Sequence, residues 1–279
     1  MSLSPRFTGA ILRQVFANLR QVFRYRALIS SLVARELKAR YRGSVLGFLW
    51  TFVNPLVLLA IYTFVFTVVM PGSRAGSRTE PYPLFLFCGI LPWTWFQSSL
   101  IESCSVLIAG GNLIRRVLFP AEILPAVAVL TGLVNFCLGL VVFVAVAAWY
   151  GRPVFSPDLA WLPVIVFVQL VLTLAFSLLL SSLTVHFRDV RDLLGNLLTL
   201  WFWGTPILYS LEQVPERFRP ILLLNPFTPL ATAYQDVLFM DEPYRGWPRL
   251  LALGAASLAL FLIAYFVFDR LRDTLAEEV

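Results

Sequence analysis

The sequence predicts an all-α integral membrane protein with six transmembrane helices, N-terminal amphipathic interface helices and short external re-entrant helices. Two observations predict this fold class: six long stretches lack any charged residue, and nearly all charges lie between them. A helix rising about 1.5 Å per residue needs roughly 20 apolar residues to cross about 30 Å of hydrocarbon. The uncharged stretches meet or nearly meet that length and cover residues 44–70, 81–101, 123–151, 159–187, 193–211 and 250–268.

Composition agrees with this fold class. The chain is 59% hydrophobic and 14% charged, whereas an average soluble domain is about 25% charged. Six spans occupy most of the 279 residues and leave no room for a folded soluble domain. We therefore divide the chain into cytoplasmic interface helices (1–43), a six-span transmembrane domain (44–270) with an external segment at about 212–247, and a cytoplasmic tail (271–279).

The distribution of Lys and Arg predicts the orientation. Fifteen of the 22 Lys and Arg residues fall on the side that carries both termini, and the side richer in these residues is usually cytoplasmic. The net charge of +6 is thus explained by topology. We do not expect nucleic-acid binding, because no basic segment interleaved with aromatic residues accompanies the charge. The first apolar stretch is longer than the core of a signal peptide, so no cleavable signal is expected.

Two segments before the first span have helical periodicity. Apolar residues between Leu12 and Phe23 follow one helical face and arginines occupy the opposite face, which predicts a helix lying in the lipid headgroup region. A second stripe steps every four residues through Ile29, Val33, Leu37 and Tyr41. Two interpretations of that stripe stay open: a basic membrane anchor, or a helix held by a cytoplasmic partner.

The external segment contains a further uncharged stretch at residues 220–235. Pro226 and Pro229 interrupt it, and proline removes a helical donor and clashes with the preceding turn. Sixteen residues with two internal prolines cannot span as one helix. We expect a pair of short helices that enter the outer interface and leave on the same side.

Several kinds of chemistry lack the residues they need. The only lysine is Lys38, which no glycine-rich phosphate loop precedes, so we expect no ATP and no other cofactor on this chain. His186 is the only histidine, and the three cysteines fall within predicted spans, where we expect small buried side chains. Glu102 is the one candidate for an intramembrane ionisable group; we expect it to reach the interface or to pair with an arginine rather than relay protons.

Aromatic residues are abundant and have two interpretations. Trp93 and Trp95 are typical of an aromatic belt at the membrane surface. Trp201 and Trp203 fit either a belt or a surface on which sugar rings stack, by analogy with base stacking on aromatic side chains. The step from Gly43 to Gly47 has the G-x-x-x-G spacing, which indicates either close helix approach or simple entry into the membrane.

Four segments carry a family resemblance. Residues 35–56 (RELKARYRGSVLGFLWTFVNPL) closely resemble the start of the first span in ABC type-2 permeases that export cell-surface polysaccharides. Residues 112–125 (NLIRRVLFPAEILP) resemble the loop between their second and third spans. Residues 187–192 (FRDVRD) resemble the start of their fifth span, and residues 225–229 (NPFTP) their external segment. The resemblance covers roughly residues 30–270 in consistent order and lies nearest the O-antigen and teichoic-acid branch.

The resemblance implies a homodimer in the cytoplasmic membrane, bound to two separate ATPase subunits that hold ATP and Mg. It implies a cargo polymer linked to a polyprenyl pyrophosphate, such as an O-antigen-like polysaccharide. The implied residues are Arg40 and Arg42 for capture of the pyrophosphate, with Trp201, Trp203 and Tyr62 along the sugar path. Contact with the ATPase is implied for Glu36, Asn112, Arg115, Arg116, Arg188, Asp189, Arg191 and Asp192.

Other functions stay open at this point. A related exporter could move teichoic acid, capsule polysaccharide, a lipid or a drug. A membrane scaffold or channel that transports nothing is the alternative from a different class, and stimulation of a partner ATPase would exclude it.

Overall fold

The computed structural model describes residues 25–40, 42–69, 79–110, 121–152, 156–187, 189–240 and 242–278, with side chains described as far as Leu271. All regular elements in these ranges are helical, which confirms the predicted all-α class. The helices are α2 (Arg26–Arg40), α3 (Trp50–Phe64), α4 (Tyr82–Ala109), α6 (Ile123–Trp149), α7 (Leu162–His186), α8 (Val190–Trp203), α9 (Arg219–Leu224), α10 (Thr228–Leu238) and α11 (Trp247–Glu278). The predicted amphipathic helix between Leu12 and Phe23 lies outside the described residues.

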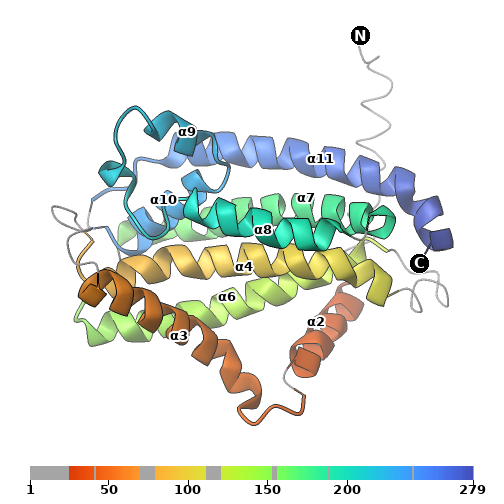
Figure 1. The fold of residues 1–279 in the computed structure, drawn as a ribbon, viewed down its shortest axis with the longest axis horizontal. Coiled ribbons are helices and arrows are strands. Elements are labelled where there is room, and N and C mark those ends of the chain that lie inside the picture. Colours follow the sequence, from red (N-terminus) through yellow and green to blue (C-terminus); the bar gives the residue numbers. More distant parts are fainter. Residues whose placement is uncertain are drawn as a thin grey trace.

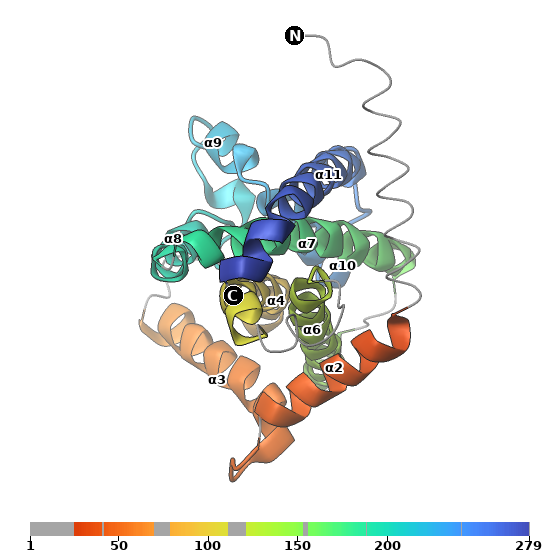
Figure 2. The same cartoon turned by 90° about the vertical axis from the view of Figure 1, so that its right-hand side faces the viewer.

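The long helices run side by side around α4 (Figure 1). Figure 2 shows α4 near the middle, with α7 and α11 on one side and α3 and α6 on the other. We call the two ends of this bundle the α2 end and the α10 end. The chain reverses direction between successive spans, so the starts of α3, α6 and α8 lie at the α2 end together with the last turn of α4.

Five helical segments within the described ranges are long and apolar enough to cross a membrane. They match five of the six predicted spans: Gly47–Val69, Tyr82–Ala109, Ile123–Trp149, Pro157–His186 and Trp247–Leu271. The predicted fifth span corresponds to α8, which has 14 residues and reaches roughly 21 Å at about 1.5 Å per residue. α8 is shorter than the predicted span of residues 193–211 because the helix stops at Trp203, with Gly204 as its C-cap. Residues 204–210 continue toward the α10 end without forming a helix.

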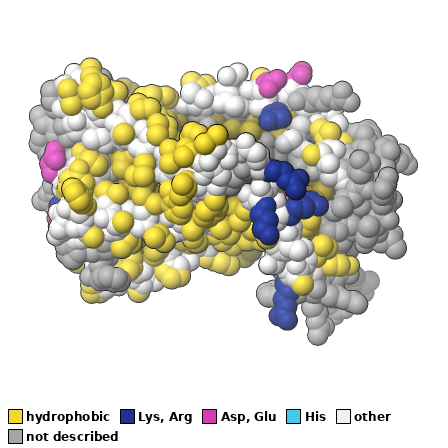
Figure 3. Space-filling model, turned by 90° about the horizontal axis from the view of Figure 1, so that it is seen from below, with side chains coloured by type: hydrophobic (Ala, Val, Ile, Leu, Met, Phe, Trp, Pro, Cys, Tyr) yellow, Lys and Arg dark blue, Asp and Glu magenta, His cyan; other side chains and the backbone are white. Residues whose placement is uncertain are grey.

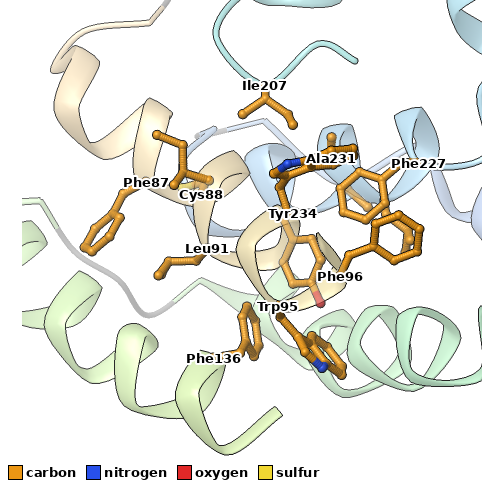
Figure 4. Packing of buried hydrophobic residues seen from close by; sticks show 14 of the residues in the cluster. Phe87, Cys88, Leu91, Trp95, Phe96, Phe136, Ile207, Phe227, Ala231 and Tyr234 are labelled. Atoms are coloured by element: carbon orange, nitrogen blue, oxygen red, sulfur yellow. The ribbon is translucent and has the colours of Figure 1, made fainter. Parts of the chain in front are cut away.

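The core lies where α4 meets its neighbours. Figure 4 shows Trp95 facing Phe136 of α6, and Phe96 beside Phe227 at the start of α10. Trp93 is only 3% exposed and Trp95 only 2%. The belt interpretation of these two tryptophans is therefore wrong. Their indoles fill the centre of the bundle, and each N–H has a protein acceptor: the side chain of Gln97 for Trp93 and a backbone carbonyl of α6 for Trp95.

One glycine allows α4 and α6 to approach closely. A Cβ at Gly132 would lie 2.6 Å from Ser99 Oγ and 2.6 Å from Trp95 Cδ1. The pair Gly43 and Gly47 has no such role. Both have positive φ, at 77° and 49°, and added Cβ atoms would meet nothing within 4 Å. The helix-approach interpretation of this pair is wrong, because these glycines form the turn between α2 and α3 rather than a helical face.

The predicted pair of short helices is present. α9 ends at Leu224, Pro226 lies in the connection, and Pro229 stands in the first turn of α10, where a missing N–H costs no helical bond. α10 packs against α4 and α7, and its side chains Leu230, Ala231 and Tyr234 are fully buried. The cysteine expectation is partly corrected: Cys88 and Cys104 are buried, whereas Cys137 is exposed on the surface of α6.

Candidate functional site

At the α2 end, an ion pair joins α2 to α4. The Nη2 of Arg40 donates a hydrogen bond to Oε2 of Glu102, and both side chains are partly shielded from solvent. Glu36, one turn before Arg40 on α2, lies close enough to act electrostatically on the Glu102 carboxylate. The expected pairing of Glu102 with an arginine is thus present. α2 is held in place as well by Ile29 and Leu32, which are buried in a cluster with residues of α4, α6, α7 and α11.

The basic side chains of α2 and the following turn are exposed around this ion pair. Arg35, Lys38 and Arg42 all face outward. Figure 3 shows Lys and Arg side chains gathered beside a broad hydrophobic surface. Two arginines are predicted to capture a pyrophosphate. Arg40 is paired with the Glu102 carboxylate, and Arg42 is exposed beyond the end of α2.

A cleft with mixed lining opens between α3, α4 and α6. It has a volume of about 240 Å³, and Arg40 lies on its lining. Its polar wall is made by Thr51, Asn54, Thr94, Ser98 and Asn135. Its apolar wall is made by Trp50, Pro55, Leu91, Trp95, Gly132 and Phe136. Sequence reasoning missed this cleft, because these residues come from four separate helices and only the fold brings them together.

The three predicted stacking residues are divided between interior and surface. Trp201 packs its ring against Trp93, Phe96 and Phe176 and donates its N–H to Asn225 Oδ1 at 2.6 Å. Trp203 points outward and is 55% exposed. Tyr62 of α3 lies 6.0 Å from the ring of Phe202, measured between centroids, so it sits beside α8 on the same flank as the exposed Trp203.

The predicted ATPase-contact residues are only partly described. Asp189, Arg191 and Asp192 are exposed where α8 begins, at the α2 end. The two carboxylates complement the partial positive charge of that helix terminus. Glu36 is half-buried on α2 beside Glu102. Four predicted contact residues lie outside the described residues: Asn112, Arg115, Arg116 and Arg188.

Two adjoining cavities of about 480 and 510 Å³ occupy the α10 end. Asp236 and Glu212 line both, together with Arg245. Burial, reinforced by the nearby charges of Glu212 and Glu242, raises the pKa of Asp236 to about 6. Sequence reasoning missed this site; the charges clustered between residues 212 and 245 were the available signal.

Within the parts of the chain that the structure describes, no group of three or more His, Cys, Asp or Glu side chains is placed to hold a metal ion. Lys38 lies in the last turn of α2, whose helical backbone does not form a phosphate loop. The arrangement instead offers polar and aromatic surfaces at both ends of a bundle of membrane-length helices. These features define a multi-pass membrane protein.

The family follows from comparison with known sequences. The chain belongs to the ABC-2 type transporter family, whose sequence model matches residues 27–239. The chain is 41% identical to the "O-antigen export system permease protein RfbA" of Myxococcus xanthus, over 93% of this chain and 98% of that protein. It is 31% identical to a protein of the same name from Klebsiella pneumoniae, over 90% and 94%. The "Polysialic acid transport protein KpsM" of Escherichia coli is more distant, at 25% over 71% and 76%.

Proposed function

We propose that this protein is the permease subunit of an ATP-driven exporter that moves a polyprenyl-pyrophosphate-linked, O-antigen-like polysaccharide across the cytoplasmic membrane. The observation that carries the proposal is the 41% identity to an O-antigen export permease along 98% of that protein's length. Relatives named for capsule and polysialic acid transport are 20–26% identical and cover less of the chain.

Energy for transport comes from a separate ATPase, present in two copies that hold ATP and Mg. The proposed contact surface combines the exposed start of α8 with residues 112–120 and with α2. In the proposed orientation the α2 end and both termini are cytoplasmic, as the excess of Lys and Arg indicates. Maleimide added outside intact cells should therefore label cysteines introduced at positions 217–245 and should not label Asp189→Cys. Labelling of Asp189→Cys from outside would show that the proposed orientation is wrong.

A second copy of the chain completes the path along which the polysaccharide crosses the membrane. Four exposed apolar side chains of α8 follow one helical face at steps of three or four residues: Leu193, Leu197, Leu200 and Trp203. We place the homodimer axis along this stripe. Trp203 and Tyr62 then line the space between protomers, where aromatic faces stack against sugar rings, while Trp201 holds α8 against α4 from behind.

We assign capture of the pyrophosphate at the cytoplasmic entrance of the transport path to Arg40 and Arg42. A pyrophosphate carries charge that bare hydrocarbon excludes at a cost of several kcal/mol, so a basic mouth next to a water-lined path lowers the barrier. Arg42 is exposed for the first contact, and Arg40 becomes available when the pyrophosphate displaces the Glu102 carboxylate.

Deletion of the gene in a strain with a known surface polysaccharide tests the function. We expect loss of surface polymer and cytoplasmic accumulation of polymer on its lipid carrier, both reversed by the wild-type gene. Normal surface polymer in the deletion strain, with no paralogue present, would contradict the proposal.

A further inference from the structure

The cleft between α3, α4 and α6 lies away from the α8 stripe. Figure 2 shows α8 on one flank of the bundle and α6 on another, with α4 between them and α2 leading to the start of α3. The cleft therefore does not belong to the stacking surface proposed around Trp203. We expect the cleft to have an occupant of its own, because the buried Asn135 Oδ1 on its lining has no hydrogen-bond partner among the described residues.

The polar lining offers hydrogen-bond acceptors and donors, because the hydroxyls of Thr94 and Ser98 keep free lone pairs and the amides of Asn54 and Asn135 carry N–H groups as well as an oxygen. The hydroxyl of Thr94 donates to the carbonyl of Ile90 at 2.8 Å, and that of Ser98 donates to the carbonyl of Trp95 at 3.2 Å. Both donors are used within α4, which leaves the oxygen lone pairs for the cleft. Asn135 Oδ1 is buried and has no hydrogen-bond partner among the described residues. A ligand that satisfies this lining must carry several hydrogen-bond donors and also acceptors.

This requirement separates candidate ligands. An ionised phosphate has acceptors only, so it can match Arg40 and amide N–H groups but leaves the Thr94 and Ser98 lone pairs and Asn135 Oδ1 without a donor. An acyl chain has no donors and would leave Asn135 Oδ1 unsatisfied, which is unfavourable for a buried polar group. A sugar ring supplies several hydroxyl donors around an apolar C–H face.

The apolar wall suits that C–H face. The indole of Trp50 is fixed by a hydrogen bond from its N–H to Ser44 Oγ at 2.9 Å. Phe136 and Trp95 pack against each other with centroids 5.2 Å apart. The volume of about 240 Å³ is below the roughly 300–1,000 Å³ of sites for drug-sized ligands, so the cleft suits one ring rather than a chain.

We infer that the cleft between α3, α4 and α6 binds the single sugar ring nearest the pyrophosphate of a lipid-linked saccharide, with the phosphates at Arg40. This inference rests on the proposed function, since it names the part of the cargo that the cleft recognises. It implies that the permease recognises the linkage end of its cargo separately from the polymer that later passes Trp203.

Binding of two synthetic lipids to the permease–ATPase complex in nanodiscs tests the inference. One lipid is a polyprenyl pyrophosphate that carries a single hexose, and the other is the same polyprenyl pyrophosphate without sugar. Asn135→Leu and Thr94→Val each remove one side-chain hydrogen-bonding group from the cleft. Thr173→Val is the matched control, since Thr173 is buried in α7 and its hydroxyl donates to the carbonyl of Gln169.

We expect each cleft variant to weaken binding of the sugar-bearing lipid by about 2- to 10-fold, the equivalent of one hydrogen bond. The lipid without sugar should bind all variants equally, and Thr173→Val should match the wild type with both lipids. Thr94 is exposed and valine has the same shape, so Thr94→Val reports on the cleft even if Asn135→Leu folds poorly.

Equal affinity of wild type and Thr94→Val for the sugar-bearing lipid would overturn the inference. The proposed function would survive that result if the lipid still bound and stimulated the ATPase. Failure of both lipids to bind or stimulate the wild-type complex would instead overturn the proposed function, and this inference with it.

Discussion

At the scale of single residues, the pair between Arg40 and Glu102 decides how α2 is attached to the bundle. The two side chains are 32% and 22% exposed, so the pair is neither a fully solvated surface contact nor a dry one. Surface pairs contribute about 0–1 kcal/mol, whereas removing one partner of a buried pair costs about 3–5 kcal/mol. The contribution of the Arg40–Glu102 pair to the unfolding free energy should lie between these limits.

We expect Arg40→Gln and Glu102→Gln each to lower the thermal stability of the purified permease. The double variant should be less destabilised than the sum of the two, with a coupling of about 1–2 kcal/mol. Thermal unfolding of the four proteins in the same detergent measures this coupling. Strictly additive losses would show that the two residues do not stabilise each other.

Trp201 and Trp203 should separate stability from transport. Trp201→Leu removes three aromatic contacts and the hydrogen bond to Asn225, and we expect a loss of about 2–3 kcal/mol in unfolding free energy. Trp203→Leu removes an exposed ring, so stability should change by less than about 0.5 kcal/mol. Export per assembled complex should nevertheless fall in Trp203→Leu.

Surface polymer normalised to the amount of membrane complex measures that export. Phe218→Leu is a suitable control, because Phe218 is an exposed aromatic residue just before α9, away from the α8 stripe. Normal export in Trp203→Leu would remove this residue from the sugar path.

Residue-scale prediction from sequence had a clear limit. The pairing of Glu102 with an arginine could be predicted, because a carboxylate in a span needs a partner. The different roles of Trp201 and Trp203 could not, because spacing alone does not say which face of a helix meets the protein. Asn135 drew no attention for the same reason: its significance depends on the fold that brings it to the same cleft as Thr94 and Ser98.

At the scale of elements, α8 exposes an apolar stripe along one face. If the exposed stripe from Leu193 to Trp203 meets its copy, cysteines at Leu197 or Leu200 should form disulfide-linked dimers under mild oxidation of membranes. Leu258→Cys is the matched control, because Leu258 is equally apolar and exposed on α11. Cross-linking of Leu258→Cys but not of the α8 variants would place the dimer axis elsewhere.

α10 should make stability depend on pH. The pKa of Asp236 is raised to about 6 from an ordinary value of 3.8, chiefly by burial. Between these two values the folded protein holds a proton that the unfolded chain has lost, so stability falls as pH rises from about 4 to about 6 and stays lower above that. Asp236→Asn should flatten this part of the profile.

Unfolding temperatures at pH 4.5, 5.5 and 7.5 test this expectation, with Glu216→Gln as a control for an exposed carboxylate of the same segment. The raised pKa of Asp236 would be contradicted if the unfolding temperature of the wild type rose from pH 4.5 to pH 7.5 and that of Asp236→Asn rose with the same slope.

Element boundaries were predictable where one physical rule dominates. Absence of charge located the five long helices, and Pro226 with Pro229 located the break between α9 and α10. The short length of α8 was not predictable, because the uncharged stretch continues past Gly204 although the helix does not. The role of α10 as part of the core also depends on tertiary packing rather than on its own sequence.

At the scale of the whole molecule, the bundle combines basic side chains at the α2 end, aromatic side chains on α3 and α8, and charged cavities at the α10 end. This order suits a cargo with an anionic lipid-linked head and a long hydroxyl-rich chain. The family and fold class followed from sequence segments and hydropathy, whereas the cleft and the cavities required the arrangement of helices.

Transport by purified components tests the central claim most directly. The permease and its ATPase are reconstituted in proteoliposomes, and lipid-linked polysaccharide is added on the side that carries the ATPase. We predict ATP-dependent appearance of polymer in the lumen, protected from an added glycosidase, and none with a hydrolysis-deficient ATPase. Stable assembly and ATP hydrolysis stimulated by the cargo, without any protected polymer, would contradict the account.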